Sequence, residues 1–322
     1  MLGARKIIPK IPDLKTWIKE FKPKSLGKAI RPALCDYSIA EEGYRSLSIL
    51  TPEKKVAVDI YPGIGVWSAV LANNGFKKVY SLEPLPTYFK YMEELASQSD
   101  NSIIPMKIDG YDWEAYNTLK TSEYLGGMEN SDWSKINPNI LFTGMLPMTS
   151  KGEQLMAQLA TCINNKMSLY TMGRIEMAMW IPDTLYTKIT SAPGSSTRCK
   201  MSVVIEACAE IKTIYSTPDT AIYPNNKYHL VHFVPFEKSK LNSDWDVFEY
   251  VLKHLFVMQR QPLQKMVKTL GPGAEIILKR LSFDPSILVG QMTAEQLDQV
   301  AVKFDQWPLR PKVLFEDESM FT

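Results

Sequence analysis

The chain has 322 residues, of which 45% are hydrophobic and 22% are charged, an ordinary composition for a globular protein with a substantial core. No apolar run approaches the roughly 18–20 residues that a membrane-spanning helix needs, so we expect no transmembrane helix and no membrane partner. The four cysteines are scattered and the three histidines do not pair with them, which predicts free thiols and no metal site.

The net charge of +2 conceals a strongly basic N-terminal arm. Residues 1–31 contain nine Lys or Arg against Asp13 and Glu20, a local charge of +7 that leaves −5 for the rest of the chain. A basic N-terminal segment with few acidic residues is compatible with a mitochondrial targeting sequence. It is equally compatible with an arm that lies along nucleic-acid phosphates. Prolines 9, 12 and 23 would interrupt a long amphipathic helix, so a cleaved presequence does not follow from this segment alone.

Apolar runs with strand composition alternate with segments of helical spacing as far as about residue 238. This alternation, with short connections, predicts an α/β fold with an open, doubly wound, mainly parallel sheet. The expected helices are 66–75, 87–97 and 151–165. The expected strands are 55–61, 78–83, 102–108, 139–144, 174–181, 201–207 and 228–234.

After residue 238 only helical patterns remain. Segments 243–259, 262–271 and 293–307 have apolar residues at helical spacing, and Thr293 and Gln296 have the spacing of a capping box. We therefore predict a doubly wound α/β first domain over 1–238 that includes the basic N-terminal arm, a small helical domain over 239–307 and a flexible tail over 308–322. The tail carries Arg310, Lys312 and the acidic cluster Glu316–Asp317–Glu318.

The stretch "VAVDIYPGIGVWSAVL", residues 56–71, is a buried strand followed by a turn with two glycines and an apolar helix. Gly63 and Gly65 would allow a ligand to approach the backbone closely, although many strand–helix turns use glycine for packing alone. Glu83 follows Gly65 by 18 residues, where a carboxylate can bind a ribose, and Asp109 follows the third strand, where a side chain can meet adenine. The alternative is that Glu83 and Asp109 are solvated loop acids.

The series Asp59, Gly63, Gly65, Glu83 and Asp109 resembles the S-adenosylmethionine pocket of the ribosomal RNA adenine dimethyltransferases. Four segments are more closely similar to the fungal mitochondrial transcription factor B proteins, which are relatives of those enzymes. They are "YSLEP", "DGYDW", "CINNKMSLYTMGRIEMAMWIP" and "PLRPKVLFEDES". The resemblance covers the chain from residue 56 to the tail. It implies a Rossmann-like class I methyltransferase fold with a small helical C-terminal domain.

The chain departs from the enzymes where their fourth strand ends in an Asn-Leu-Pro-Tyr type motif. Here the sequence is Met145, Leu146, Pro147 and Met148, so the polar anchor and the stacking ring for the target adenine are both replaced. We therefore expect no catalytic residues and no required cofactor. Met145 would line a vestigial S-adenosylmethionine pocket together with Asp59, Glu83 and Asp109. Tyr61 replaces the first glycine of the turn and would narrow it.

Two aromatic residues follow Asp109 closely, Tyr111 and Trp113. If Asp109 ends a strand, both belong to a loop beside the old base pocket, where exposed rings can stack on unpaired bases. The alternative is that Trp113 packs on the core and Tyr111 has no special role.

Five basic residues are candidate phosphate contacts. Arg198 and Lys200 lie in the loop "SAPGSSTRCKMS", which in the dimethyltransferases adjoins the nucleic acid, and Lys151, Lys166 and Arg174 are weaker candidates. Lys265, Lys268, Lys279 and Arg280 make the helical domain basic without indicating which partner it faces. Ordinary surface charge is the alternative for each of them.

The resemblance implies a mitochondrial matrix protein that binds the single-subunit mitochondrial RNA polymerase as one partner of a heterodimer. It would promote promoter melting by capturing unpaired non-template bases. The first alternative is an active S-adenosylmethionine-dependent rRNA adenine dimethyltransferase. The second is a nucleic-acid-binding structural protein without a polymerase partner.

Overall fold

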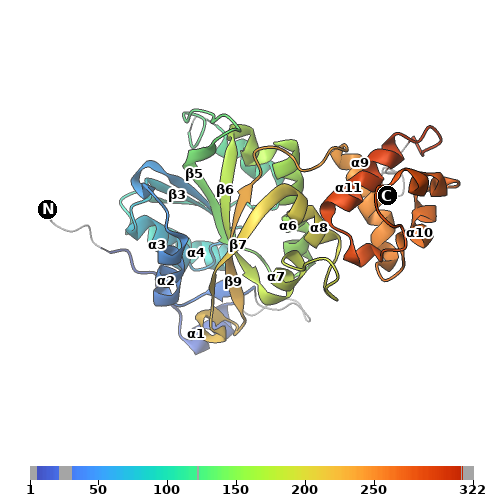
Figure 1. Ribbon diagram of the computed structural model, residues 1–322. Coiled ribbons are helices and arrows are strands. Elements are labelled where there is room, and N and C mark those ends of the chain that lie inside the picture. The colour runs from blue at the N-terminus through green and yellow to red at the C-terminus, as the bar shows by residue number, and fades with distance from the viewer. Residues whose placement is uncertain (1–5, 22–30, 122, 313, 315–322) are drawn as a thin grey trace, which may run out of the picture. The chain divides into compact units, whose positions relative to one another are not determined.

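A computed structural model describes residues 6–21, 31–121, 123–312 and 314 (Figure 1). The acidic cluster at 316–318 and part of the basic arm lie outside these residues. The described chain divides into two compact units. Unit 1 comprises residues 1–158, 166–186 and 211–237, and unit 2 comprises residues 159–165, 187–210 and 238–322.

A seven-stranded sheet in the order β4-β3-β2-β5-β6-β9-β7 forms the centre of the first unit. Strands β4 to β6 are parallel to their neighbours, and β9 is antiparallel to β6. This arrangement confirms the predicted Rossmann-like α/β fold. The strands are β2 (Val56–Ile60), β3 (Lys78–Leu82), β4 (Ile103–Met106), β5 (Ile136–Met145), β6 (Arg174–Pro182), β7 (Ala209–Ser216) and β9 (Tyr228–Pro235).

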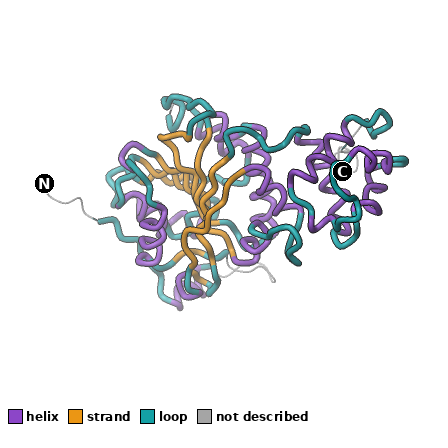
Figure 2. The backbone as a smooth tube through the Cα atoms, in the orientation of Figure 1, coloured by secondary structure: helices purple, strands orange, loops and turns teal. Residues whose placement is uncertain are grey.

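Figure 2 shows helices on both sides of this sheet. Central strands read as continuous apolar runs because both of their faces are covered, and every residue of β2 is buried. One core cluster joins this sheet to α2, α3 and α4, with Trp67 and Trp180 in edge-to-face contact inside it. The helices are α2 (Tyr37–Leu47), α3 (Val66–Asn73), α4 (Pro86–Ala96), α5 (Trp113–Leu119), α6 (Ser150–Asn165) and α7 (Asp183–Ile189), with short 3-10 turns at Pro52–Lys54, Ser168–Met172 and Asp219–Ala221.

The N-terminal arm packs onto unit 1. The Asn73 side chain binds both the N–H and the carbonyl of Ile7, at 2.8 and 2.7 Å. Helix α1 (Leu14–Glu20) buries Trp17, whose ring stacks on Tyr223 at 4.6 Å. Strand β1 (Ala33–Leu34) then pairs antiparallel with β8 (Ile222–Tyr223).

The second unit is helical, and its three predicted helical regions are present. The Thr293–Gln296 capping box is formed at the start of α11. Arg310, in the predicted tail, forms an ion pair with Asp305 at the end of α11, with 3.0 Å between Nη2 and Oδ1. The α-helices are α8 (Lys200–Cys208), α9 (Trp245–Leu255), α10 (Leu263–Met266) and α11 (Ala294–Asp305), and 3-10 segments cover Phe256–Met258, Val267–Leu270, Ala274–Arg280 and Val289–Gln291.

The prediction of a strand over 201–207 is wrong, because these residues form α8. Ser202 caps the helix by accepting the Cys199 N–H at 3.0 Å, and the strand follows at Ala209–Ser216. Residues 187–210 also group with unit 2, so the single domain boundary near 238 differs from the observed division. No described helix has the length and apolarity to cross a membrane.

Candidate functional site

The turn between β2 and α3 is shaped by the protein's own side chains. Tyr61, Gly63 and Gly65 all have positive φ, at 56, 63 and 87°. A Cβ on Gly63 would lie 2.8 Å from the Cβ of Ala33, and one on Gly65 would lie 2.6 Å from Leu95. Both glycines are therefore required by conformation and by internal packing, without any ligand.

Glu83, at the end of β3, is fully buried and its carboxylate is already bound. It accepts the N–H of Gly63 at 3.1 Å and that of Leu85 at 2.9 Å, and the Arg31 guanidinium donates to the same Oε2 as Gly63. Burial raises the pKa of Glu83, and Arg31 and the two N–H donors oppose that rise. The acid predicted to hold a ribose is thus paired with an arginine of the same chain.

The Arg31 guanidinium fills the space between two rings. Its central carbon lies 5.1 Å from the centre of the Tyr61 ring and 4.7 Å from that of Tyr88. The backbone carbonyl of Arg31 also accepts the Tyr88 hydroxyl at 2.6 Å. The contacts of Arg31 with Glu83, Tyr61 and Tyr88 seat it beside the glycine turn.

Asp109, after β4, is bound in the same way. Its carboxylate accepts the Tyr61 hydroxyl, the Lys151 ammonium at 2.5 Å and the Tyr111 N–H at 3.0 Å. Burial alone would raise the pKa of Asp109, but the bonds from Lys151 and Tyr61 outweigh it and hold this pKa below its usual value. The acid expected to meet adenine is thus bound by three groups of the same chain.

Asp59, on β2, has one bound and one free oxygen. Its Oδ2 accepts the Ser68 hydroxyl at 2.5 Å, and its Oδ1 has no partner among the described residues. Burial raises the pKa of Asp59 to about 7, with the Ser68 bond opposing. Asp59 is fully buried and does not reach a ligand surface.

We call Gly63, Glu83 and Asp109 the cradle. An S-adenosylmethionine molecule needs free acceptors at Glu83 and Asp109 for its ribose and adenine, and here Arg31, Tyr61 and Lys151 use them. The residues present therefore do not fit this cofactor with these side chains in place. Sequence analysis noted Tyr61 but did not connect Arg31 with Glu83, which is 52 residues away.

The four residues Met145–Met148, at and just after the end of β5, have no polar side chain. Met145 is buried in the core cluster, Leu146 is fully buried, and Met148 is 40% exposed. The Leu146 N–H donates to the Trp180 carbonyl at 2.9 Å, and its carbonyl accepts the Tyr228 hydroxyl at 3.1 Å. This strand end is firmly held but has no side chain that can recognise the amine of a base.

Beside the cradle, we define the rim as Tyr111, Trp113 and Met148. Trp113 is the first residue of α5 and is 43% exposed, while Tyr111 is half-buried. The Lys151 ammonium lies 5.0 Å from the centre of the Tyr111 ring, and the Tyr111 hydroxyl donates to Gln154 at 3.3 Å. The rim therefore presents the exposed Trp113 and a half-buried Tyr111 ring beside Lys151, features that suit the binding of unstacked bases.

The structure places two of the three weaker cation candidates, Lys166 and Arg174, apart from the rim. Lys166 follows α6 and Arg174 begins β6, which is the opposite edge of the sheet from Asp109 and Met145. Lys166 lies 5.0 Å from the Trp133 ring centre, and Arg174 donates to the carbonyls of Ser134 and Pro235. Of these candidates, Lys151 alone adjoins the rim.

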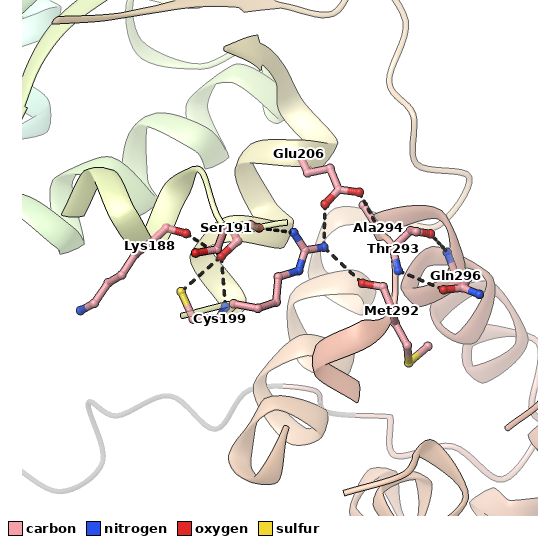
Figure 3. Close-up of polar contacts among 10 residues, drawn as sticks. Lys188, Ser191, Cys199, Glu206, Met292, Thr293, Ala294 and Gln296 are labelled. Atoms are coloured by element: carbon pink, nitrogen blue, oxygen red, sulfur yellow. Dashed lines mark hydrogen bonds and ion pairs between the residues drawn. The ribbon is translucent and has the colours of Figure 1, made fainter. Parts of the chain in front are cut away.

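The prediction that Arg198 contacts phosphate is wrong, because its side chain is 1% exposed. It donates to the carbonyls of Ser191 at 2.9 Å and Met292 at 3.2 Å and lies 2.6 Å from the Glu206 carboxylate (Figure 3). Glu206 also accepts the Ala294 N–H at 3.0 Å, so this cluster ties α8 to α11 within unit 2. Lys200 is half-exposed, 3.5 Å from Glu249, and remains a candidate.

Comparisons with known proteins identify the relatives of this chain. It is 28% identical to mitochondrial transcription factor 1 of Saccharomyces paradoxus over 84% of this chain and 85% of the relative, and 25% identical to that of Lachancea kluyveri over 89% and 92%. It is 23% identical to the mitochondrial dimethyladenosine transferase 1 of Vermamoeba vermiformis, over 95% and 97%. These names confirm the predicted kinship and the mitochondrial location.

Solved structures agree on the fold. A dimethyladenosine transferase from Plasmodium falciparum matches with a TM-score of 0.63 and 12% identity, over 85% of this chain and 98% of that one. The 23S rRNA methyltransferase ErmE matches with a TM-score of 0.54 and 16% identity, over 85% and 100%. The profile described as RrnaAD, ribosomal RNA adenine dimethylase, matches residues 36–305, and the chain belongs to this family.

Proposed function

We propose that this protein is a mitochondrial transcription initiation factor that works with the mitochondrial RNA polymerase and holds unpaired non-template bases on the rim, without transferring a methyl group. The observation that carries the proposal is the contrast at one sheet edge. The acceptors of Glu83 and Asp109 are bound internally, while Trp113 and Met148 remain exposed. The relatives named mitochondrial transcription factor 1 support the same function.

The rim would bind unpaired bases without reacting with them. A base that leaves the duplex loses its stacking partner, and an exposed ring can replace it for about 1–3 kcal/mol per base. Trp113 supplies such a ring, and Tyr111, two residues earlier, is held at this edge by the bond from its N–H to Asp109. Lys151 supplies a nearby positive charge for the backbone of the captured strand.

Methyl transfer has no support at this site. Met145 and Met148 stand where an amide and a ring would hold the target adenine, and a thioether is too weak an acceptor to orient an amine. The cradle acids are occupied by Arg31, Tyr61 and Lys151. These side chains would have to be displaced before a cofactor could bind.

The test is a transcription assay on linear promoter DNA with the cognate mitochondrial polymerase, with and without this protein. We expect initiation on the duplex promoter to depend on the protein, and this dependence to disappear on a template that is pre-melted around the start site. Equal dependence on both templates would contradict a melting role and indicate a different step.

The second candidate, an rRNA adenine dimethyltransferase, is favoured by family membership and by the dimethyladenosine transferase relatives. Calorimetry with S-adenosylmethionine and methyl incorporation into an rRNA hairpin separate it from the first. We expect neither binding nor incorporation. Methyl incorporation above a no-protein control would establish the second candidate.

A further inference from the structure

Three polar residues meet at the edge of the sheet where β6 ends, on strands that are neighbours in the order β6-β9-β7. Asp183 begins α7 directly after β6, His229 is the second residue of β9, and Ser216 is the last residue of β7. His229 pairs in register with Ile181, two residues before Asp183. All of these residues belong to unit 1, and their edge is the carboxyl edge of the parallel strands, where α/β sheets carry their sites.

Hydrogen bonds join the three side chains in a line. Nε2 of His229 lies 2.8 Å from Oδ1 of Asp183, and the hydroxyl oxygen of Ser216 lies 2.8 Å from Nδ1 of His229. The partners are 46 and 13 positions apart in the sequence, so the fold brings them together. A hydroxyl, an imidazole and a carboxylate in this order are the parts of a nucleophilic triad, and we call these residues the triad.

The carboxylate decides the direction of both bonds. The bond from His229 lowers the pKa of Asp183, and the charge of Lys227, 3.5 Å away, acts in the same direction. An ionised carboxylate only accepts hydrogen bonds, so Nε2 carries the proton of the neutral imidazole and Nδ1 presents a lone pair. The Ser216 hydroxyl therefore donates to Nδ1, the arrangement in which a base can remove its proton.

The base of the triad is buried and its hydroxyl is accessible. His229 is 4% exposed, and the Tyr186 ring stacks on its imidazole with 3.8 Å between the ring centres. The Tyr186 hydroxyl is hydrogen-bonded to the Thr213 hydroxyl at 2.9 Å, which holds the ring in this position. Ser216 is exposed. The imidazole is thus shielded from bulk water, whereas a reagent in solution can reach the hydroxyl that it polarises.

We propose that Ser216 is a nucleophile that accepts the acyl group of an activated ester. Its oxygen bonds to the carbonyl carbon while its proton passes to Nδ1 of His229, and Asp183 stabilises the imidazolium that forms. The bond from the carbonyl carbon to the leaving oxygen then breaks, and that oxygen takes the proton from Nδ1. The products are an acyl-serine and a free alcohol or phenol, so the step needs no further reactant.

The triad goes beyond the proposed role in transcription, since it shares no residue with the cradle or the rim. Its test measures acyl transfer in the absence of promoter DNA and polymerase. Either proposal can therefore fail while the other stands.

The probe is p-nitrophenyl acetate, added to the full chain. Release of nitrophenolate follows the reaction, and peptide mass spectrometry locates each acetyl group and its rate of attachment. His229→Gln removes the base, and Ser216→Ala removes the nucleophile. Ser46→Ala is the matched control for Ser216→Ala, because the exposed Ser46 hydroxyl donates to the Glu42 carbonyl and not to an imidazole.

Asp183→Asn separates reactivity from structure. An amide can donate to Nε2, which would place the imidazole proton on Nδ1 and remove the base while both hydrogen bonds remain possible. Thermal unfolding checks that each variant folds. Asp183→Asn keeps the proposal testable if His229→Gln does not fold, because Asp183 is half-exposed.

We expect acetyl on Ser216 in the wild type and in Ser46→Ala, and loss of the fastest phase of nitrophenolate release in Ser216→Ala. Acetylation of Ser216 should be at least about a hundredfold slower in His229→Gln, the lower limit for general-base catalysis, and slower in Asp183→Asn as well. The wild-type rate should fall on acidification as the imidazole is protonated, and His229→Gln should lack this inflection.

Three results would overturn the proposal. They are acetylation of Ser216 no faster than that of Ser46 in the wild type, equal acetylation of Ser216 in the wild type and His229→Gln, and an unchanged rate in Asp183→Asn. Any of them would leave the triad as a set of hydrogen bonds that ties β6, β7 and β9 together.

Discussion

The cradle and the rim lie at the same edge of one sheet and differ in what their side chains bind. In the cradle, Glu83 and Asp109 are bound by Arg31, Tyr61 and Lys151. In the rim, Trp113 and Met148 are exposed. The difference shows that acids at the ends of strands can be fully bound by side chains of the same chain while the adjacent surface stays accessible.

Asp109 links the two regions. One of its oxygens accepts the Tyr61 hydroxyl of the cradle together with the Tyr111 N–H of the rim, and the other accepts Lys151. Through its bond to the Tyr111 N–H, this carboxylate also holds the backbone that carries a rim side chain. The predictions below test this division, starting with the largest expected effect.

The first prediction concerns the ion pair that fills the cradle. Arg31→Met leaves the Glu83 carboxylate buried without its cation, and we expect a loss of about 3–5 kcal/mol in the free energy of unfolding at pH 8. Urea unfolding measures it. Adding Glu83→Gln in the double variant is expected to recover most of the loss, because the uncompensated charge is gone. If the single and double variants have equal free energies of unfolding, the instability does not come from the unpaired Glu83 charge, and the Arg31–Glu83 ion pair is not what stabilises the cradle.

The second prediction concerns the exposed rings. Tyr111→Ala with Trp113→Ala should weaken binding to a promoter with a melted bubble by about 2–4 kcal/mol, since each stacked base contributes about 1–3 kcal/mol. Binding to intact duplex should change little. The matched control is Tyr111→Phe with Trp113→Phe, which keeps both rings and should retain binding in a fluorescence-anisotropy titration. Equal losses on bubble and duplex would show that the rim does not stack on bases.

The third prediction concerns Asp59 and pH. Its pKa of about 7 in the folded protein lies above the ordinary aspartate value of 3.8, so the folded state binds the proton more tightly than the unfolded state. The stability associated with this proton is complete below about pH 4 and is lost as pH rises through 7. Between pH 5 and pH 8 the wild type should therefore lose on the order of 2 kcal/mol relative to Asp59→Asn, which does not titrate.

Unfolding curves of the two proteins at pH 5, 6.5 and 8 provide this measurement. Glu83 remains in both proteins, and its charge adds to the raised pKa of Asp59, so the difference reports Asp59 together with this coupling. A difference that stays constant with pH would mean that the Asp59 carboxyl is not held neutral by burial.

The smallest predicted effect concerns Lys151, which contacts both regions. If it also meets the backbone of a captured strand, Lys151→Gln should lower the salt slope of single-strand binding by about 0.7, the value for one phosphate contact. Lys90→Gln, at an exposed position on α4, should leave the slope unchanged. An unchanged slope for Lys151→Gln would assign this lysine to the cradle alone.

Sequence analysis predicted the fold because its signals are local. Continuous apolar strands and short connections define a doubly wound sheet, and the Thr293–Gln296 spacing located a helix start. Segment 201–207 was mistaken for a strand because its valines and isoleucine suit a sheet, whereas Ser202 caps a helix there. A short β-branched run does not by itself distinguish the two.

The candidate site was predicted only in part, because long-range pairing decides it. The positions of Glu83 and Asp109 after their strands followed from the pattern, whereas Trp113, which was expected in a loop, begins α5. The pairing of Arg31 with Glu83 joins residues 52 positions apart, and the burial of Arg198 depends on Met292, 94 positions away. Neither partner is visible from the composition of the loop in which each arginine lies.

The N-terminal arm has a consequence for import into mitochondria. The Asn73 side chain binds the N–H and the carbonyl of Ile7, Trp17 stacks on Tyr223, and Arg31 pairs with Glu83, so the described part of the arm contributes to the folded domain at three separate places. Proteolytic removal of a targeting peptide that extended to residue 31 would take core residues away. Cleavage after Ile7, after Trp17 or after Arg31 would therefore cost the folded domain one, two or all three of these contacts.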